Sequence, residues 1–161
     1  MQTVTMTGHR PEKIDDPVWV KRQIKDALTV PLVPNFLVQG MASGVDLWSA
    51  QIARQLGILY ECAKPWAGHK PRKDDQKLYD EVLHFADKIT NVNEAEDYPG
   101  PWVYQNRNKY MVQQADVVLA VWDGTPGGTA NCVQYAVKKN LPIFRIDPKK
   151  KIRGWYANRP V

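Results

Sequence analysis

One segment of the chain constrains the fold more than any other, because it passes from an apolar run into a glycine-rich turn and then into a helix-like stretch. The apolar run is residues 117–122, the turn is 123–131, and the helix-like stretch extends from Cys132 to Lys139. A strand that is apolar on both faces is typical of a parallel sheet covered by helices on each side. We therefore expect this segment to be one strand–helix unit of an α/β domain.

Strand-like and helix-like segments alternate along the rest of the chain. The expected strands are 3–7, 36–38, 58–63, 88–92, 117–122 and 142–146, and the expected helices are 19–28, 46–56, 74–85, 102–115 and 132–139. This alternation predicts a Rossmann-like, doubly wound and mainly parallel sheet of about six strands, with helices on both faces. The 161 residues fit a single domain, 1–161, with a basic tail at 148–161. The loop 94–101 is the least regular part and a candidate lid.

The excess positive charge lies at the end of the chain. The net charge is +5, and residues 149–161 contain five Lys or Arg and no Asp or Glu. Such a tail can attract nucleic acid, although a solvated terminus is the simpler interpretation. No stretch approaches the roughly 20 apolar residues of a membrane span, and we see no signal peptide. Two cysteines without a CxxC pattern indicate neither a disulfide framework nor a zinc site. We expect a cytoplasmic protein with no metal, no cofactor and no membrane partner.

Several loops with glycine or polar residues follow the expected strands, so their positions should converge on one edge of the sheet. Ligands of open α/β sheets bind outside the carboxyl ends of the strands, and a glycine-rich turn before a helix suits a phosphate group. The candidate ligand-binding residues are Gly8, His9, Arg10, Gly40, Ser43, Gly44, Asp46, Arg107, Asp123, Gly124, Gly127, Gly128, Thr129 and Asn131. Structural roles remain open for them: the glycines can simply form turns, Arg10 can form a surface ion pair, and Asp46 can cap a helix.

Four well-known catalytic or nucleotide-binding patterns do not occur in the sequence. There is no GxGxxG dinucleotide fingerprint and no Gly-Lys-Ser/Thr phosphate loop. There is also no GxSxG and no HExxH motif. These absences weigh against a dehydrogenase, an ATPase, an esterase and a zinc peptidase.

The order of the remaining motifs resembles the SLOG superfamily, named for DNA-processing protein A and the LONELY GUY proteins. The markers are Thr7-Gly8-His9-Arg10-Pro11, the segment Gly40–Asp46, Arg107-Asn108 with Met111, Ala115-Asp116, and Gly127-Gly128-Thr129. The pattern is most similar to the YpsA-like and phage-encoded branch. This resemblance implies a Rossmann-like fold that binds nucleotides or nucleotide-derived small molecules, often as a homodimer.

The same resemblance bears on whether the chain is an enzyme. LONELY GUY enzymes hydrolyse nucleoside monophosphates with an arginine, which Arg107 matches, and a glutamate after the Gly-Gly turn. Here the turn continues to the neutral Asn131, so the carboxylate that would stabilise an oxocarbenium-like state is missing. This favours a module that senses or sequesters a nucleotide-derived ligand. The alternative is a nucleotide N-glycosidic hydrolase with Arg107, Asp46 and Asp123 as candidate catalytic residues, and a weaker alternative is single-stranded DNA binding.

Overall fold

The computed structural model describes residues 2–160, which form one sheet flanked by helices. The strand order is β4-β3-β2-β1-β5-β6-β7. The strands are β1 (Thr3–Gly8), β2 (Phe36–Gln39), β3 (Leu59–Lys64), β4 (Lys88–Asn91), β5 (Val117–Val121), β6 (Ile143–Asp147) and β7 (Ile152–Ala157). Neighbouring strands are parallel except for the antiparallel pair β6 and β7. The expected Rossmann-like, mainly parallel sheet is therefore confirmed.

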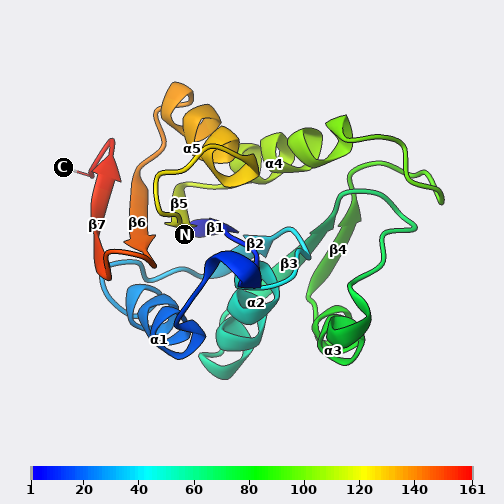
Figure 1. Ribbon diagram of the computed structural model, residues 1–161, viewed down its shortest axis with the longest axis horizontal. Coiled ribbons are helices and arrows are strands. Elements are labelled where there is room, and N and C mark those ends of the chain that lie inside the picture. Colours follow the sequence, from blue (N-terminus) through cyan, green and yellow to red (C-terminus); the bar gives the residue numbers. More distant parts are fainter. Residues whose placement is uncertain (1, 161) are drawn as a thin grey trace.

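Helices cover both faces of this sheet (Figure 1). Those on one face are α1 (Pro17–Ala27), α2 (Val45–Gln55) and α3 (Gln76–His84), and those on the other are α4 (Trp102–Gln114) and α5 (Gly128–Lys138). Two short 3-10 helices, η1 (Pro11–Lys13) and η2 (Lys73–Asp75), lie in the loops after β1 and β3. No helix within residues 2–160 is both long and apolar enough to cross a membrane.

The centre of the sheet is buried on both faces, as the apolar run predicted. Every residue of β5 is buried, and so are four of the six residues of β1. Apolar residues of α1 and α2, such as Ile24 and Leu47, pack in one cluster with Met6 and Leu119. The core thus fixes β1 and β5 side by side in the middle of the molecule.

Two expectations about element boundaries were wrong. Helix α5 begins at Gly128 instead of Cys132, because the low helix propensity of Gly and Thr hides its first turn. The basic tail is also not simply a solvated terminus, since residues 152–157 form a seventh strand. The Trp155 ring packs edge-on against Phe144 at a centroid distance of 5.3 Å, which ties this strand to the sheet.

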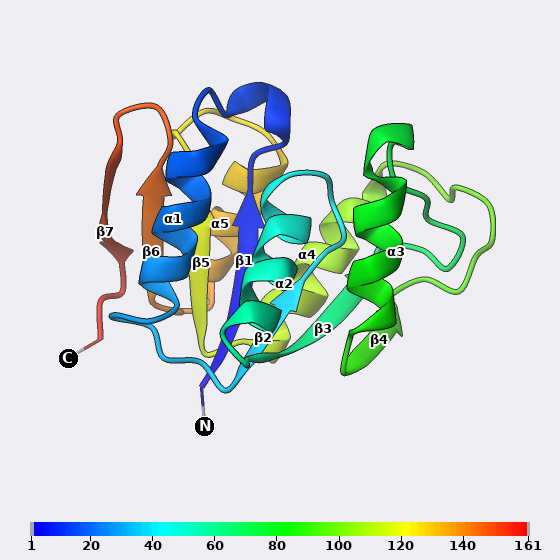
Figure 2. The same ribbon diagram turned by 90° about the horizontal axis from the view of Figure 1, so that it is seen from below.

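The strand order reverses between β1 and β5, which marks the place where a ligand site is expected. From β1 the chain proceeds to β2, β3 and β4 on one side, whereas β5 leads to β6 and β7 on the other (Figure 2). Gly8 at the end of β1 pairs with Val121 at the end of β5. The loops after these two strands consequently diverge from one point at the carboxyl edge.

Candidate ligand-binding site

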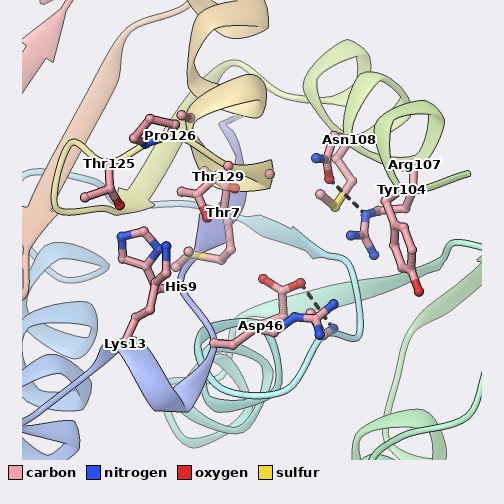
Figure 3. A pocket seen from close by; sticks show the side chains of 18 of the residues that line it. Thr7, His9, Lys13, Asp46, Tyr104, Arg107, Asn108, Thr125, Pro126 and Thr129 are labelled. Atoms are coloured by element: carbon pink, nitrogen blue, oxygen red, sulfur yellow. Dashed lines mark hydrogen bonds between the residues drawn. The ribbon is translucent and has the colours of Figure 1, made fainter. Parts of the chain in front are cut away.

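A pocket of about 370 Å³, here called the main pocket, opens at the carboxyl ends of β1 and β5. Its walls come from the loops after these strands, from the start of α2 and from one side of α4 (Figure 3). The predicted residues that line it are Gly8, His9, Arg10, Asp46, Arg107, Gly127, Gly128 and Thr129. Segments that are far apart in the sequence therefore contribute to a single cavity.

The N-terminus of α5 opens into the main pocket without a side-chain cap. Its N-cap is Gly127, with φ of 144°, and no side chain accepts a hydrogen bond from the first turn. Helix α1, by contrast, is capped by Asp16, which accepts from the Trp19 N–H at 3.1 Å. The first N–H groups of a helix have no partner within the helix, so those of α5 are available to an anion in the pocket.

Arg107 is a buried cation on the pocket wall. Its side chain donates from Nε to Asn108 Oδ1 at 3.0 Å and from Nη1 to the Gly40 carbonyl. The residue is only 7% exposed, and burial lowers the pKa of its guanidinium while Asp46 opposes that change. A side-chain carbon at Gly40 would lie 2.6 Å from Nη1, so Gly40 leaves room for the arginine. Within residues 2–160 no protein atom receives a hydrogen bond from Nη2, which leaves donors for a bound group.

Asp46 organises the loop after β2 and does not cap α2, which has Gly44 at its N-cap. Its Oδ2 accepts hydrogen bonds from the N–H groups of Gly40 and Ala42, both at 3.2 Å. Burial raises the pKa of this carboxyl group, and Arg107 and the two N–H groups act against that increase. Oδ1 has no donor among the described residues, so it can accept a hydrogen bond from a ligand.

Asp123 forms hydrogen bonds within the glycine-rich loop between β5 and α5, and it does not line the main pocket. Its Oδ1 accepts from Thr125 Oγ1 at 2.5 Å and from the Thr125 N–H at 3.0 Å, and it lies 2.9 Å from His9 Nε2. Burial acts to raise the pKa of Asp123, but the hydrogen bonds donated by Thr125 and the close contact with His9 outweigh it and place this pKa below its usual range. Asp123 therefore fixes the shape of the loop between β5 and α5.

The other predicted residues outside the main pocket have clear positions. Ser43 donates a 2.5 Å hydrogen bond to Asp75, and Gly44 packs against Pro11 with φ of 87°. Gly124 adopts φ of 91° within the turn, and Asn131 is exposed on the first turn of α5. Ser43, Gly44 and Gly124, like Gly40 and Asp123, lie in the loops around the cavity, whereas Asn131 lies within α5.

The candidate list lacked six polar residues that line the main pocket, namely Thr7, Glu12, Lys13, Tyr104, Asn108 and Thr125, although Thr7 and Asn108 are among the family markers. The spacing of Tyr104, three residues before Arg107, was a usable signal because such residues share one helix face. Lys13 ends η1, whose position after β1 the sequence did not predict. Within residues 2–160 no three His, Cys, Asp or Glu side chains are grouped so as to hold a metal ion.

A comparison with models of protein families shows which family this chain belongs to. The model of the YspA SLOG family (YpsA) matches residues 5–150. The chain belongs to this family. The SPbeta prophage-derived protein YoqJ of Bacillus subtilis is 40% identical over 46% of this chain and 50% of its own length. The expected superfamily, with its YpsA-like and phage-encoded relatives, is thereby confirmed.

Solved structures of other proteins share the fold. DNA processing protein A from Streptococcus pneumoniae has a TM-score of 0.70 at 18% identity, over 91% of this chain and 50% of that one. The Helicobacter pylori protein, described with a single-stranded DNA binding mode, has a TM-score of 0.69 at 21% identity, over 91% and 65%. The molybdenum cofactor binding protein of Rippkaea orientalis has a TM-score of 0.61 at 18% identity, over 89% and 75%. The chain thus spans only about half of YoqJ and of the Streptococcus protein.

Proposed function

We propose that this protein binds a nucleotide or a nucleotide-derived small molecule in the main pocket, as a sensor or a sequestering module. The observation that carries this proposal is the convergence of positive charge on one cavity. Arg10, Lys13 and the buried Arg107 line it beside the uncapped N-terminus of α5. A phosphate group is the ligand chemistry that such N–H groups and guanidinium groups bind best.

The remaining walls suit the rest of a nucleotide. Asp46 Oδ1, which has no donor among the described residues, can accept a hydrogen bond from a ribose hydroxyl. Tyr104 and Met111 add an aromatic ring and an apolar surface to the same cavity. A volume of about 370 Å³ lies within the range of about 300–1,000 Å³ that small-molecule pockets occupy.

A nucleotide N-glycosidic hydrolase is the second candidate, and the position of Asp46 supports it. This carboxylate lies in the same pocket as Arg107, so it could stabilise an oxocarbenium-like state in place of the missing glutamate. The chemical fate of the ligand separates the two functions. Sequestration leaves the nucleotide intact, whereas hydrolysis releases a free base that chromatography detects.

The proposal is tested with a variant that fills the phosphate position without straining the backbone. An added Cβ at Gly128 meets no atom within 4 Å, and so does one at Gly154 in β7, far from the pocket. Gly128→Val should weaken the binding of adenosine monophosphate at least about tenfold in calorimetry, because the side chain keeps phosphate from the N–H groups. Gly154→Val is the matched control and should bind like the unmodified protein. Equal affinity in both variants would move the site away from α5.

A further inference from the structure

A smaller pocket of about 150 Å³, here called the side pocket, adjoins the main pocket. Arg10, Ala42, Tyr104 and Arg107 line both cavities. Tyr104 and Arg107 lie one turn apart on α4, so this single helix face forms the boundary between the two spaces. A ligand in the main pocket can therefore extend past these residues into the side pocket.

The side pocket is cationic and has no carboxylate in its lining, as far as residues 2–160 show. Arg10 and Lys70 form no ion pair within this part of the chain, whereas Arg72 is paired with Glu12 at 2.6 Å. Burial lowers the pKa of His69 to about 4, so this imidazole is neutral at pH 7. The free positive charge of the side pocket thus comes from Arg10, Lys70 and the shared Arg107.

The charge of the two cavities together exceeds what one phosphate can neutralise. Four cations, Arg10, Lys13, Lys70 and Arg107, face one carboxylate, Asp46, once the Glu12–Arg72 pair is set aside, which leaves three positive charges. A phosphate monoester carries about −1.5 to −2 charges at pH 7. Arg10, Lys13 and Lys70 are exposed, so solvent screens part of this charge, and a second phosphate group complements what remains.

We propose that the ligand carries two separate phosphate groups, one at the N-terminus of α5 and the other in the side pocket beside Arg10 and Lys70. This inference rests on the proposed function and narrows it to nucleotides with phosphates at two positions, either a nucleoside bisphosphate or a dinucleotide. The second phosphate accepts charge-assisted hydrogen bonds from these two cations, which form no ion pair within residues 2–160. Trp66 and Tyr104 form the aromatic part of the side pocket, against which a dinucleotide can place its second base.

The test compares three probes by calorimetry: adenosine 5′-monophosphate, adenosine 3′,5′-bisphosphate and the dinucleotide pApA. We expect at least one of the two doubly phosphorylated probes to bind about tenfold more tightly than the monophosphate. In Lys70→Gln the ratio of the doubly phosphorylated probe's affinity to that of the monophosphate should fall at least about threefold, because Lys70 lines only the side pocket. Lys25→Gln, on the exposed side of α1, is the matched control and should keep the ratio unchanged.

The outcomes separate this inference from the proposed function. If the bisphosphate binds more tightly than the monophosphate, the side pocket is assigned to a terminal phosphate. If the dinucleotide binds more tightly, the side pocket is assigned to a phosphodiester with its base. If the monophosphate binds as tightly as both other probes, the two-phosphate inference is overturned and the proposed function stands. The inference is equally overturned if Lys70→Gln weakens all three probes by the same factor. If none of the probes binds the unmodified protein, the proposed function fails as well.

Discussion

At the scale of single residues, Arg107 combines a structural role with the proposed binding role. Arg107→Ala removes the donor to the Gly40 carbonyl and to Asn108 Oδ1, both of which are buried. We expect the free energy of unfolding to fall by about 1–3 kcal/mol and nucleotide affinity to fall at least about tenfold. Denaturant titration measures the first effect and calorimetry the second.

Arg10 supplies the control that distinguishes these two roles. Its side chain is exposed and forms no ion pair within residues 2–160, so Arg10→Gln should leave stability within about 0.5 kcal/mol. The same variant should weaken nucleotide binding, because Arg10 lines both pockets. Unchanged affinity in Arg10→Gln would remove this residue from the site.

His69 predicts a pH dependence of stability with a defined sign. Burial lowers the pKa of His69 from 6.5 to about 4, so the unfolded chain binds a proton more readily than the folded protein between these values. Stability from this group is therefore present above about pH 6.5 and is lost as the pH falls toward 4. We expect the unmodified protein to lose about 1–2 kcal/mol more than His69→Gln between pH 7 and pH 4.5. Denaturant unfolding at the two pH values measures the difference, and identical losses would contradict the assignment.

The sequence predicted which residues lie at the sheet edge, but it did not predict which groups they form hydrogen bonds with. Sequence reasoning placed Gly8 and Gly128 at one edge because parallel strands end there, and it selected Arg107 from the resemblance to the LONELY GUY enzymes. It could not show that Asp46 binds the loop N–H groups of Gly40 and Ala42 instead of capping α2, because that depends on the path of the loop. It also treated Asp123 as a ligand candidate, although its oxygen faces Thr125 and His9.

At the scale of elements, the turn between β5 and α5 depends on one carboxylate. Asp123→Ala removes the acceptor for two hydrogen bonds from Thr125 and the neighbour of His9. The variant should lose about 1–3 kcal/mol of unfolding free energy and bind nucleotide more weakly, because the turn no longer holds the start of α5 in place. Thermal unfolding and calorimetry on the same sample measure both effects. Full stability and affinity in the variant would show that the turn holds its shape without Asp123.

The elements that the sequence predicted well are those with a strong apolar pattern. Strand β5 and helix α1, with its Asp16 cap and Pro17 at the first position, appear within a few residues of their expected bounds. Strand β7 was missed because its pattern is interrupted by Arg153 and Gly154, and only pairing with β6 orders it. Helix α5 was predicted to begin too late because Gly128 and Thr129 are weak helix formers.

At the scale of the whole molecule, the fold and the family are established, and the assembly is a prediction. Relatedness to the SLOG superfamily leads us to expect a homodimer. Native mass spectrometry of freshly purified protein should give twice the mass of one chain, together with any nucleotide that co-purifies. A mass of one chain at micromolar concentration would contradict the homodimer without affecting the proposed site.

The central claim is that a phosphate group binds at the N-terminus of α5 in the main pocket. An amide-resolved NMR titration with adenosine monophosphate tests it most directly. We predict that the largest shifts fall on the N–H groups of Gly127, Gly128, Thr129 and Ala130, with the Arg107 side chain shifting in the same titration. Shifts confined to β7 and the basic residues before it would contradict the claim and favour binding of nucleic acid at the tail.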